Sequence, residues 1–375
     1  MAGLSHYYVD YGAGNDTTGD GSVGTPWKTI QKALDNAVED DGVQVNIKAG
    51  TAQVLAASLD MTAYTVTNGV PASLDPLILR GYTSSANDGG IGEIDCGGNT
   101  MWADSGLDYI GLYELKIHNG GNNNLVGLDA NIVVVKCELC AGASSPSGKF
   151  LLGFNNGLVA GCYLHDTGDG AAKGIHCGSA FVIGNHIVLD ADAAAACGIK
   201  GCNSAYNIIV CQKTDQRAIE APYSAYGNIC YNTTAGATSA IRHAVSAFGA
   251  VTPLMNNIIV GWSGVGGIGI QVRAPSGYGH NAFYNCTTNT SYTYDFSGGL
   301  STANDVALAA NPFTDAGNGD FSLTAAAKTA LADKGFPVSY YGAHANTTSN
   351  FNIGPIQNDA AAGGGSSNPL HGKLG

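Results

Sequence analysis

The stretch Asn207-Ile208-Ile209 decides the fold, because its pattern returns along the chain. At each return a small polar residue or a cysteine comes first and an apolar residue stands two places later: Cys137-Glu138-Leu139, Cys162-Tyr163-Leu164, Asn185-His186-Ile187, Asn228-Ile229-Cys230, Asn257-Ile258-Ile259 and Asn281-Ala282-Phe283. In chain order the leading residues are separated by 25, 23, 22, 21, 29 and 24 positions. A period of about 22 residues is too short for most helical repeats and is typical of a parallel β-helix.

A coil of such a solenoid cannot bury its apolar residues alone. Coils stacked at the strand spacing of about 4.8 Å would bury the apolar residues of the repeat as one continuous column. The leading asparagines are expected at a turn, where their amides can bond from coil to coil. We expect the coils over residues 43–300, beginning with a half-buried strand at 43–48, whose side chains alternate with period two.

Both ends of a solenoid need caps, since open strand edges aggregate. Thr25 as N-cap, Pro26 at the first helical position and apolar residues on one face predict an amphipathic helix over 26–38. Residues 1–42 thus form a strand, a loop and this capping helix. Residues 301–357 form an irregular C-terminal cap, and 358–375 are a Gly/Ser-rich tail. The predicted architecture is all-β: a single parallel β-helix with a cap at each end.

Composition restricts the function. The 375 residues contain 16 Lys+Arg and 29 Asp+Glu, and the net charge of −13 disfavours nucleic acid and anionic bilayers as partners. No apolar run of about 18 residues is present, so no membrane insertion is expected. The first residues lack a basic region followed by an apolar one, which predicts either a removed export signal or assembly in a host cytoplasm.

Ten cysteines are too few for a disulfide-dense scaffold in a chain of 375 residues. The spacings Cys137-x2-Cys140 and Cys197-x4-Cys202 resemble metal half-sites, but no pair at zinc spacing completes either. We therefore predict reduced thiols that act as small apolar core residues, with no metal and no cofactor.

A second apolar column consists of Ile175, Ile199, Ile219, Ile241 and Ile270. Because strand side chains alternate, the residue after each should face outward. The resulting strip contains His176, Lys200, Glu220, Arg242 and Gln271. It is either a row of solvated cross-strand pairs or one side of a glycan groove, for which Tyr223, Tyr226 and Trp262 are the candidate sugar-stacking aromatics.

Two segments carry a family resemblance. The opening, with Tyr7-Tyr8-Val9 and Thr25-Pro26-Trp27-Lys28-Thr29-Ile30, resembles the start of pectate-lyase-like right-handed β-helix proteins, and the segment from Asn311-Pro312-Phe313 to Asn352–Gln357 resembles their closing part. The resemblance and the bias of parallel crossovers imply right-handed coils. The superfamily includes polysaccharide lyases, glycoside hydrolases, adhesins and phage tail or decoration proteins, so it does not settle function.

The sequence offers two candidate catalytic arrangements. Glu220 with Arg242-His243 resembles the alginate and chondroitin lyases built on β-helices, but the position of the lysine base of that family is occupied by Ser224. Hydrolysis would need two or three carboxylates converging at about 5–10 Å. The nearest candidates, which are equally ordinary turn residues, are Asp166, Asp169, Asp190, Asp192 and Asp215.

Our leading hypothesis is a non-enzymatic structural protein of a virus particle: a phage decoration, spike or fibre subunit that also binds glycan. It would be assembled in the host cytoplasm, and would self-associate as a homo-oligomer or attach to capsid or tail proteins through its C-terminal tail. The alternative is a secreted polysaccharide lyase or glycoside hydrolase on the same scaffold, and a third reading is an adhesin that binds glycan without cleaving it.

Overall fold

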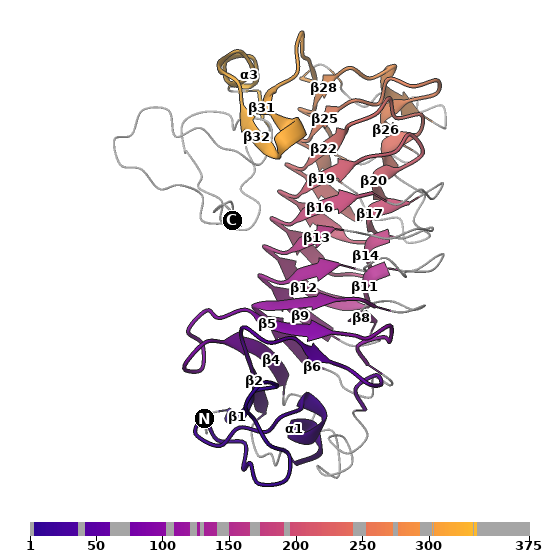
Figure 1. Cartoon of the computed structure of the whole chain (residues 1–375). Coiled ribbons are helices and arrows are strands. Elements are labelled where there is room, and N and C mark those ends of the chain that lie inside the picture. Colours follow the sequence, from indigo (N-terminus) through magenta and orange to yellow (C-terminus); the bar gives the residue numbers. More distant parts are fainter. Residues whose placement is uncertain are drawn as a thin grey trace. The chain divides into compact units, whose positions relative to one another are not determined.

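The structure is a computed structural model that describes residues 4–36, 42–60, 76–102, 109–120, 126–127, 131–140, 150–165, 173–190, 196–242, 253–272, 277–292, 302, 304–332 and 334–335. The chain divides into two compact units, residues 1–180 and 181–375. Each unit is built from three parallel β-sheets whose strands succeed one another coil by coil (Figure 1). The predicted fold class, an all-β right-handed parallel β-helix, is confirmed.

Three sheets form the first unit. The first sheet contains β1 (Ser5–Val9), β2 (Val43–Lys48), β4 (Leu77–Tyr82), β6 (Tyr109–Tyr113), β9 (Asn131–Val135) and β12 (Asn156–Ala160). The second contains β3 (Gln53–Val54), β5 (Gly92–Asp95), β7 (Leu115–His118), β10 (Glu138–Cys140) and β13 (Tyr163–His165). The third contains β8 (Val126–Gly127), β11 (Phe150–Phe154) and β14 (Lys173–Cys177).

The second unit repeats this plan. Its first sheet contains β15 (Phe181–Ile183), β18 (Asn203–Ala205), β21 (Ser224–Tyr226), β24 (Leu254–Met255) and β27 (Tyr278–Gly279). Its second contains β16 (His186–Leu189), β19 (Ile208–Cys211), β22 (Ile229–Asn232), β25 (Ile258–Val260), β28 (Ala282–Tyr284) and β30 (Val306–Ala307). Its third contains β17 (Cys197–Lys200), β20 (Arg217–Glu220), β23 (Ser239–Arg242), β26 (Ile268–Val272) and β29 (Thr288–Tyr292).

The amphipathic helix is shorter than predicted. It spans α1 (Ile30–Asn36) and buries Ile30, Ala33 and Leu34. Trp27 lies in extended backbone that bridges to Val9 of β1, so the helix cannot begin at Pro26 and Thr25 is not its N-cap. Thr29 takes that role, since its hydroxyl oxygen accepts a hydrogen bond from the Lys32 amide at 3.2 Å.

Strand β2 is confirmed, but it is not half-buried. Gln44 and Asn46, which alternation predicts on the solvent side, are 3% and 0% exposed. The Asn46 amide donates to the Tyr7 carbonyl at 2.9 Å, and the Gln44 amide donates to Asn87 Oδ1 at 3.0 Å. The outer face of this first coil is therefore satisfied by hydrogen bonds instead of water.

The predicted inner columns are present in both units. Leu139 pairs with Leu164 in the first unit, and the second unit stacks Ile187, Ile209, Cys230, Ile259 and Phe283. The other column stacks Ile199, Ile219, Ile241 and Ile270. All of these side chains are buried.

The predicted asparagine ladder forms in the second unit. The side-chain amide of each asparagine donates to the Oδ1 of the next, at 2.9 Å from Asn185 to Asn207, 3.0 Å to Asn228, 3.1 Å to Asn257 and 3.0 Å to Asn281. Each Oδ1 also accepts from the backbone N–H of the preceding ladder residue. Asp305 ends the row by accepting from the Asn281 N–H at 2.9 Å.

Cysteines occupy the ladder position in the first unit and make one of the same bonds. Asn228 donates to the carbonyl of Ser204, three positions before the preceding ladder residue Asn207, at 3.1 Å. The thiols of Cys137 and Cys162 donate to the corresponding carbonyls of Leu112 and Val134, at 3.5 and 3.6 Å. Burial raises the pKa of the Cys137 thiol well above its ordinary value, which keeps its proton available for this bond.

The residue before each ladder position adopts a left-handed backbone. It is glycine at 161, 184 and 227, but Lys136, Tyr206, Asn256 and His280 have φ of 52°, 56°, 59° and 56°. A side chain in this conformation costs roughly 1 kcal/mol, and the coil accepts that cost because the turn aims the next residue inward.

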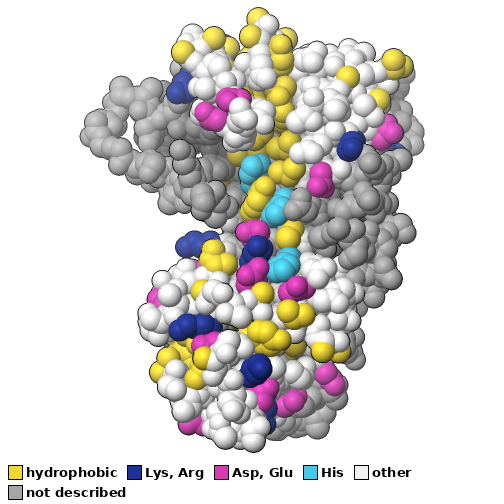
Figure 2. Space-filling model, viewed as in Figure 1, with side chains coloured by type: hydrophobic (Ala, Val, Ile, Leu, Met, Phe, Trp, Pro, Cys, Tyr) yellow, Lys and Arg dark blue, Asp and Glu magenta, His cyan; other side chains and the backbone are white. Residues whose placement is uncertain are grey.

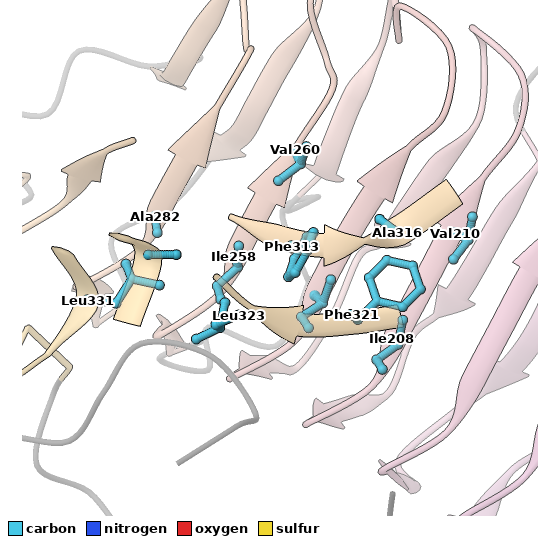
Figure 3. Close-up of a cluster of buried hydrophobic side chains, with 12 residues drawn as sticks. Ile208, Val210, Ile258, Val260, Ala282, Phe313, Ala316, Phe321, Leu323 and Leu331 are labelled. Atoms are coloured by element: carbon cyan, nitrogen blue, oxygen red, sulfur yellow. The ribbon is translucent and has the colours of Figure 1, made fainter. Parts of the chain in front are cut away.

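The closing segment covers one sheet of the second unit. It contains the antiparallel pair β31 (Phe313–Asp315) and β32 (Asp320–Leu323), the 3-10 turn η1 (Ala316–Asn318) and α3 (Ala325–Leu331). Phe313, Phe321, Leu323 and Leu331 pack on the outer face of β19, β22, β25 and β28 (Figure 3). No helix among the described residues is long and apolar enough to span a bilayer.

We predict that Asn228→Ala lowers the free energy of unfolding by about 3 kcal/mol, because the Asn207 amides and the Ser204 hydroxyl lose a buried acceptor. Urea unfolding monitored by circular dichroism measures the change. The control is Asn318→Ala at an exposed position, which should change the free energy by less than about 0.5 kcal/mol. Equal effects of the two variants would contradict a structural ladder.

We also predict that Gly161→Ala destabilises the protein by about 1 kcal/mol through backbone strain alone. Gly161 has φ 62°, and the nearest atom to an added Cβ would be Cγ of Lys136 at 4.0 Å, so no clash contributes. Gly24→Ala is the matched control, because its added Cβ would meet nothing within 4 Å. A neutral Gly161→Ala variant in the same unfolding assay would refute the strain argument.

Candidate functional surface

The predicted charged strip is brought together in the second unit. Strand register places Lys200 beside Glu220, Glu220 beside Arg242 and Arg242 beside Gln271. His176 lies on β14 of the first unit and is partly exposed. The alternation rule therefore located the row correctly.

Glu220 pairs with Arg242 of this row and with Arg217 of its own strand. Glu220 Oε2 lies 3.7 Å from Arg217 Nη1, and its Oε1 lies 3.9 Å from Arg242 Nη1. The Glu220 side chain is only 16% exposed, whereas that of Arg242 is 29% exposed. One carboxylate thus holds two guanidinium groups, of which Arg217 was not part of the prediction.

The other residues predicted for a glycan groove are mostly inaccessible. Trp262 is 0% exposed and Tyr226 is 4% exposed, with its hydroxyl oxygen accepting from the Asn256 amide at 2.7 Å. Neither ring can stack on a sugar at the surface, so that expectation is wrong for both, while Tyr223 is partly exposed. Ser224, at the position of the absent base, is buried and its hydroxyl donates to Asn203 Oδ1 at 3.0 Å.

The carboxylate cluster is only partly described. Asp166, Asp169 and Asp192, together with His243 of the lyase-like pattern, lie outside the described residues. Asp190 directly follows β16 and is partly buried, and Asp215 is exposed ahead of β20.

The outer face of the second sheet differs between the two units. In the second unit it carries apolar residues such as Ile208, Val210 and Ile258, which the closing segment covers. In the first unit the corresponding positions form two polar columns. In the first column, strand register aligns Glu93, Lys116, Glu138 and Tyr163. In the second column, it pairs Asp95 with His118 and Cys140 with His165.

We call these eight residues the polar face. Figure 2 shows acidic, basic and histidine side chains gathered in a line over this sheet. Lys116 Nζ lies 3.4 Å from Glu93 Oε1 and 4.0 Å from Glu138 Oε1. His118 Nε2 lies 3.1 Å from Glu93 Oε1, and His165 Nε2 lies 3.2 Å from Glu138 Oε1.

Lys116 is the electrostatic centre of the polar face. Partial burial disfavours its charged form, but the carboxylates of Glu93 and Glu138 outweigh burial and raise its pKa above the ordinary value. Its ammonium group therefore stays protonated between two glutamates. Asp95 instead accepts two hydrogen bonds, one from the Gly97 backbone N–H and one from the Asn119 side-chain amide, each at 2.8 Å.

Sequence reasoning missed the polar face although the signal was present. The residues on either side of inward-facing Leu139 and Leu164 must point outward, and they are Glu138 with Cys140 and Tyr163 with His165. The alternation that predicts the strip beside the isoleucine column therefore also predicts these outward positions beside the leucine column.

The cysteines support the prediction of buried core thiols and correct the prediction that all of them are reduced. Eight are free, and all of these except Cys286 are buried. Cys177 and Cys202 are disulfide-bonded, so the prediction of reduced thiols is wrong for these two. The half-site Cys137-x2-Cys140 does not form as a pair, because Cys137 bonds to backbone carbonyls in the interior while Cys140 shares the outer face with Glu138.

We predict that Glu220→Gln lowers the free energy of unfolding by about 1 kcal/mol, because two guanidinium groups lose their shared counter-charge. The double variant Glu220→Gln with Arg242→Gln should recover part of this loss, since it also removes one unpaired cation. Urea unfolding of the four proteins of the cycle measures the coupling. Strict additivity would show that the pairing has no energetic weight.

Comparison with known proteins yields a similarity of fold. No protein-family model matches the chain, and no curated protein matches it. Among solved structures, the chain is similar to one described as the crystal structure of pectate lyase Pel9A, with 13% sequence identity and a TM-score of 0.47. That similarity covers 94% of this chain and 97% of the other.

Proposed function

We propose that the protein is a non-enzymatic structural subunit of a virus particle: a phage decoration, spike or fibre component that also contacts glycan. The observation that carries the proposal is that the candidate catalytic side chains bond to other side chains of the protein. Glu220 is shared by two arginines, and the serine at the predicted base position is buried in a hydrogen bond. These groups stabilise stacked coils, which is what a rigid building element requires.

The buried thiols fit the same proposal. Burial raises the pKa of the free Cys211 and Cys230 thiols, which are packed in the core of the second unit. Free core thiols of this kind are compatible with folding in a reducing host cytoplasm, whereas the disulfide-bonded Cys177 and Cys202 favour an oxidising compartment and count against this part of the proposal. Self-association, or attachment to capsid or tail proteins through residues 358–375, completes the proposal, although those residues lie outside the described part of the chain.

The proposal predicts assembly without catalysis. Light scattering of the full chain should give a mass above that of a monomer, and a variant that ends at Gln357 should lose this association. The untruncated chain at the same concentration is the control. A full chain that stays monomeric across the accessible concentration range would contradict the assembly role.

The enzymatic alternative is tested with the same protein. Incubation with a panel of uronate polymers, monitored by the ultraviolet absorbance of the unsaturated product, should give no signal. Product formation that Glu220→Gln abolishes, and that Asn318→Ala leaves intact, would overturn the structural proposal in favour of a lyase.

A further inference from the structure

We propose that Glu138, Cys140 and His165 of the polar face form a binding site for a divalent transition metal ion, with zinc as the preferred ion. One ligand atom from each residue lies within 4.8 Å of the other two. This inference goes beyond the structural role proposed above and stands without it. It also revises the expectation of no metal, which considered Cys140 only together with Cys137.

Parallel stacking explains why the three side chains converge. Glu138 and Cys140 are two positions apart on β10, so their side chains leave the same face of the strand. Cys140 pairs in register with His165 of β13, which places the two side chains directly opposite each other on neighbouring coils. The triangle of ligands thus rests on the backbone of two hydrogen-bonded strands, a more rigid support than a loop.

The donor set is the one that zinc prefers. Thiolate, imidazole and carboxylate are its three protein ligand types, and a soft thiolate disfavours magnesium and calcium. Ligand atoms around a tetrahedral zinc lie roughly 3.3–3.8 Å apart. His165 Nε2 and Glu138 Oε1 are already 3.2 Å apart, and Cys140 Sγ lies within 4.8 Å of both. A side-chain rotation that brings this sulfur closer to the other two atoms completes the triangle.

Neighbouring residues favour the bound state. The Tyr163 ring stacks on the His165 ring, with centroids 4.4 Å apart and an interplanar angle of 21°. This stacking restrains the orientation of the imidazole. Lys116 is closer to Glu93 than to Glu138, at 3.4 against 4.0 Å, so it keeps a counter-charge when Glu138 turns to the metal.

Charge balance and access agree with this assignment. A thiolate and a carboxylate neutralise the two positive charges of the ion, and binding releases the Cys140 thiol proton. The side chains of Glu138 and His165 are 37% and 18% exposed. Three protein ligands at a partly open face leave the fourth position of zinc to water or to an anionic group of a ligand.

The test uses the full chain, freed of metal with a chelator and titrated with Co²⁺ as a spectroscopic probe. A thiolate-to-cobalt charge-transfer band that saturates at one equivalent, and that Zn²⁺ then displaces, is the expected result. Cys140→Ser should abolish the band. Cys286→Ser, which removes the partly exposed thiol outside the site, should leave it unchanged.

Affinity variants separate the complete site from binding by the thiol alone. His165→Gln and Glu138→Gln should each weaken Zn²⁺ binding more than about 100-fold by isothermal titration, while circular dichroism shows the fold intact. The proposal is overturned if the thiolate band is absent, if it survives Cys140→Ser, or if both affinity variants bind zinc like the parent chain.

Discussion

The structure depends on one repeated interaction, the buried hydrogen bond that a ladder side chain makes to the neighbouring coil. In the second unit the Oδ1 of Asn228 accepts from both the backbone and the side chain of Asn207. Its own amide reaches a backbone carbonyl and Asn257. Because these groups are buried, any slip of one coil against the next would leave several of them unpaired, at a cost of about 1–3 kcal/mol each. The ladder therefore specifies the register of the stack.

Register in turn determines which side chains meet on the surface. A shift of one residue would exchange the inner and outer faces of every strand. The rows on the outer faces of the strands exist only because the inner columns are aligned. In one row Lys200, Glu220 and Arg242 lie side by side, and on the other face Glu138 lies beside Tyr163 and Cys140 beside His165. The first unit uses the same turn with a thiol in place of the amide, and this thiol makes one of the same bonds to a backbone carbonyl.

Much of this could be predicted from the sequence, because a repeat converts position along the chain into position in space. The period predicted the inner columns, the asparagine ladder and the row around Glu220. It did not predict the burial of Trp262 and Tyr226, the second of which packs against Tyr206 of the neighbouring coil. Nor did it predict the start of α1, where pairing of Trp27 with Val9 outweighs the helix signal of Pro26. The site at Cys140 escaped because zinc spacing was sought along the chain, whereas its ligands come from two coils.

Hydrogen exchange of backbone amides, followed by mass spectrometry, tests the central role of the ladder most directly. The N–H groups of Asn185, Asn207, Asn228 and Asn257 lie at turns, where amides ordinarily exchange fast, yet each donates to a buried side-chain oxygen of the next coil. The account predicts that peptides containing these turns exchange as slowly as the strands beside them. Exchange at the rate of exposed turns such as that around Gly317 would contradict it.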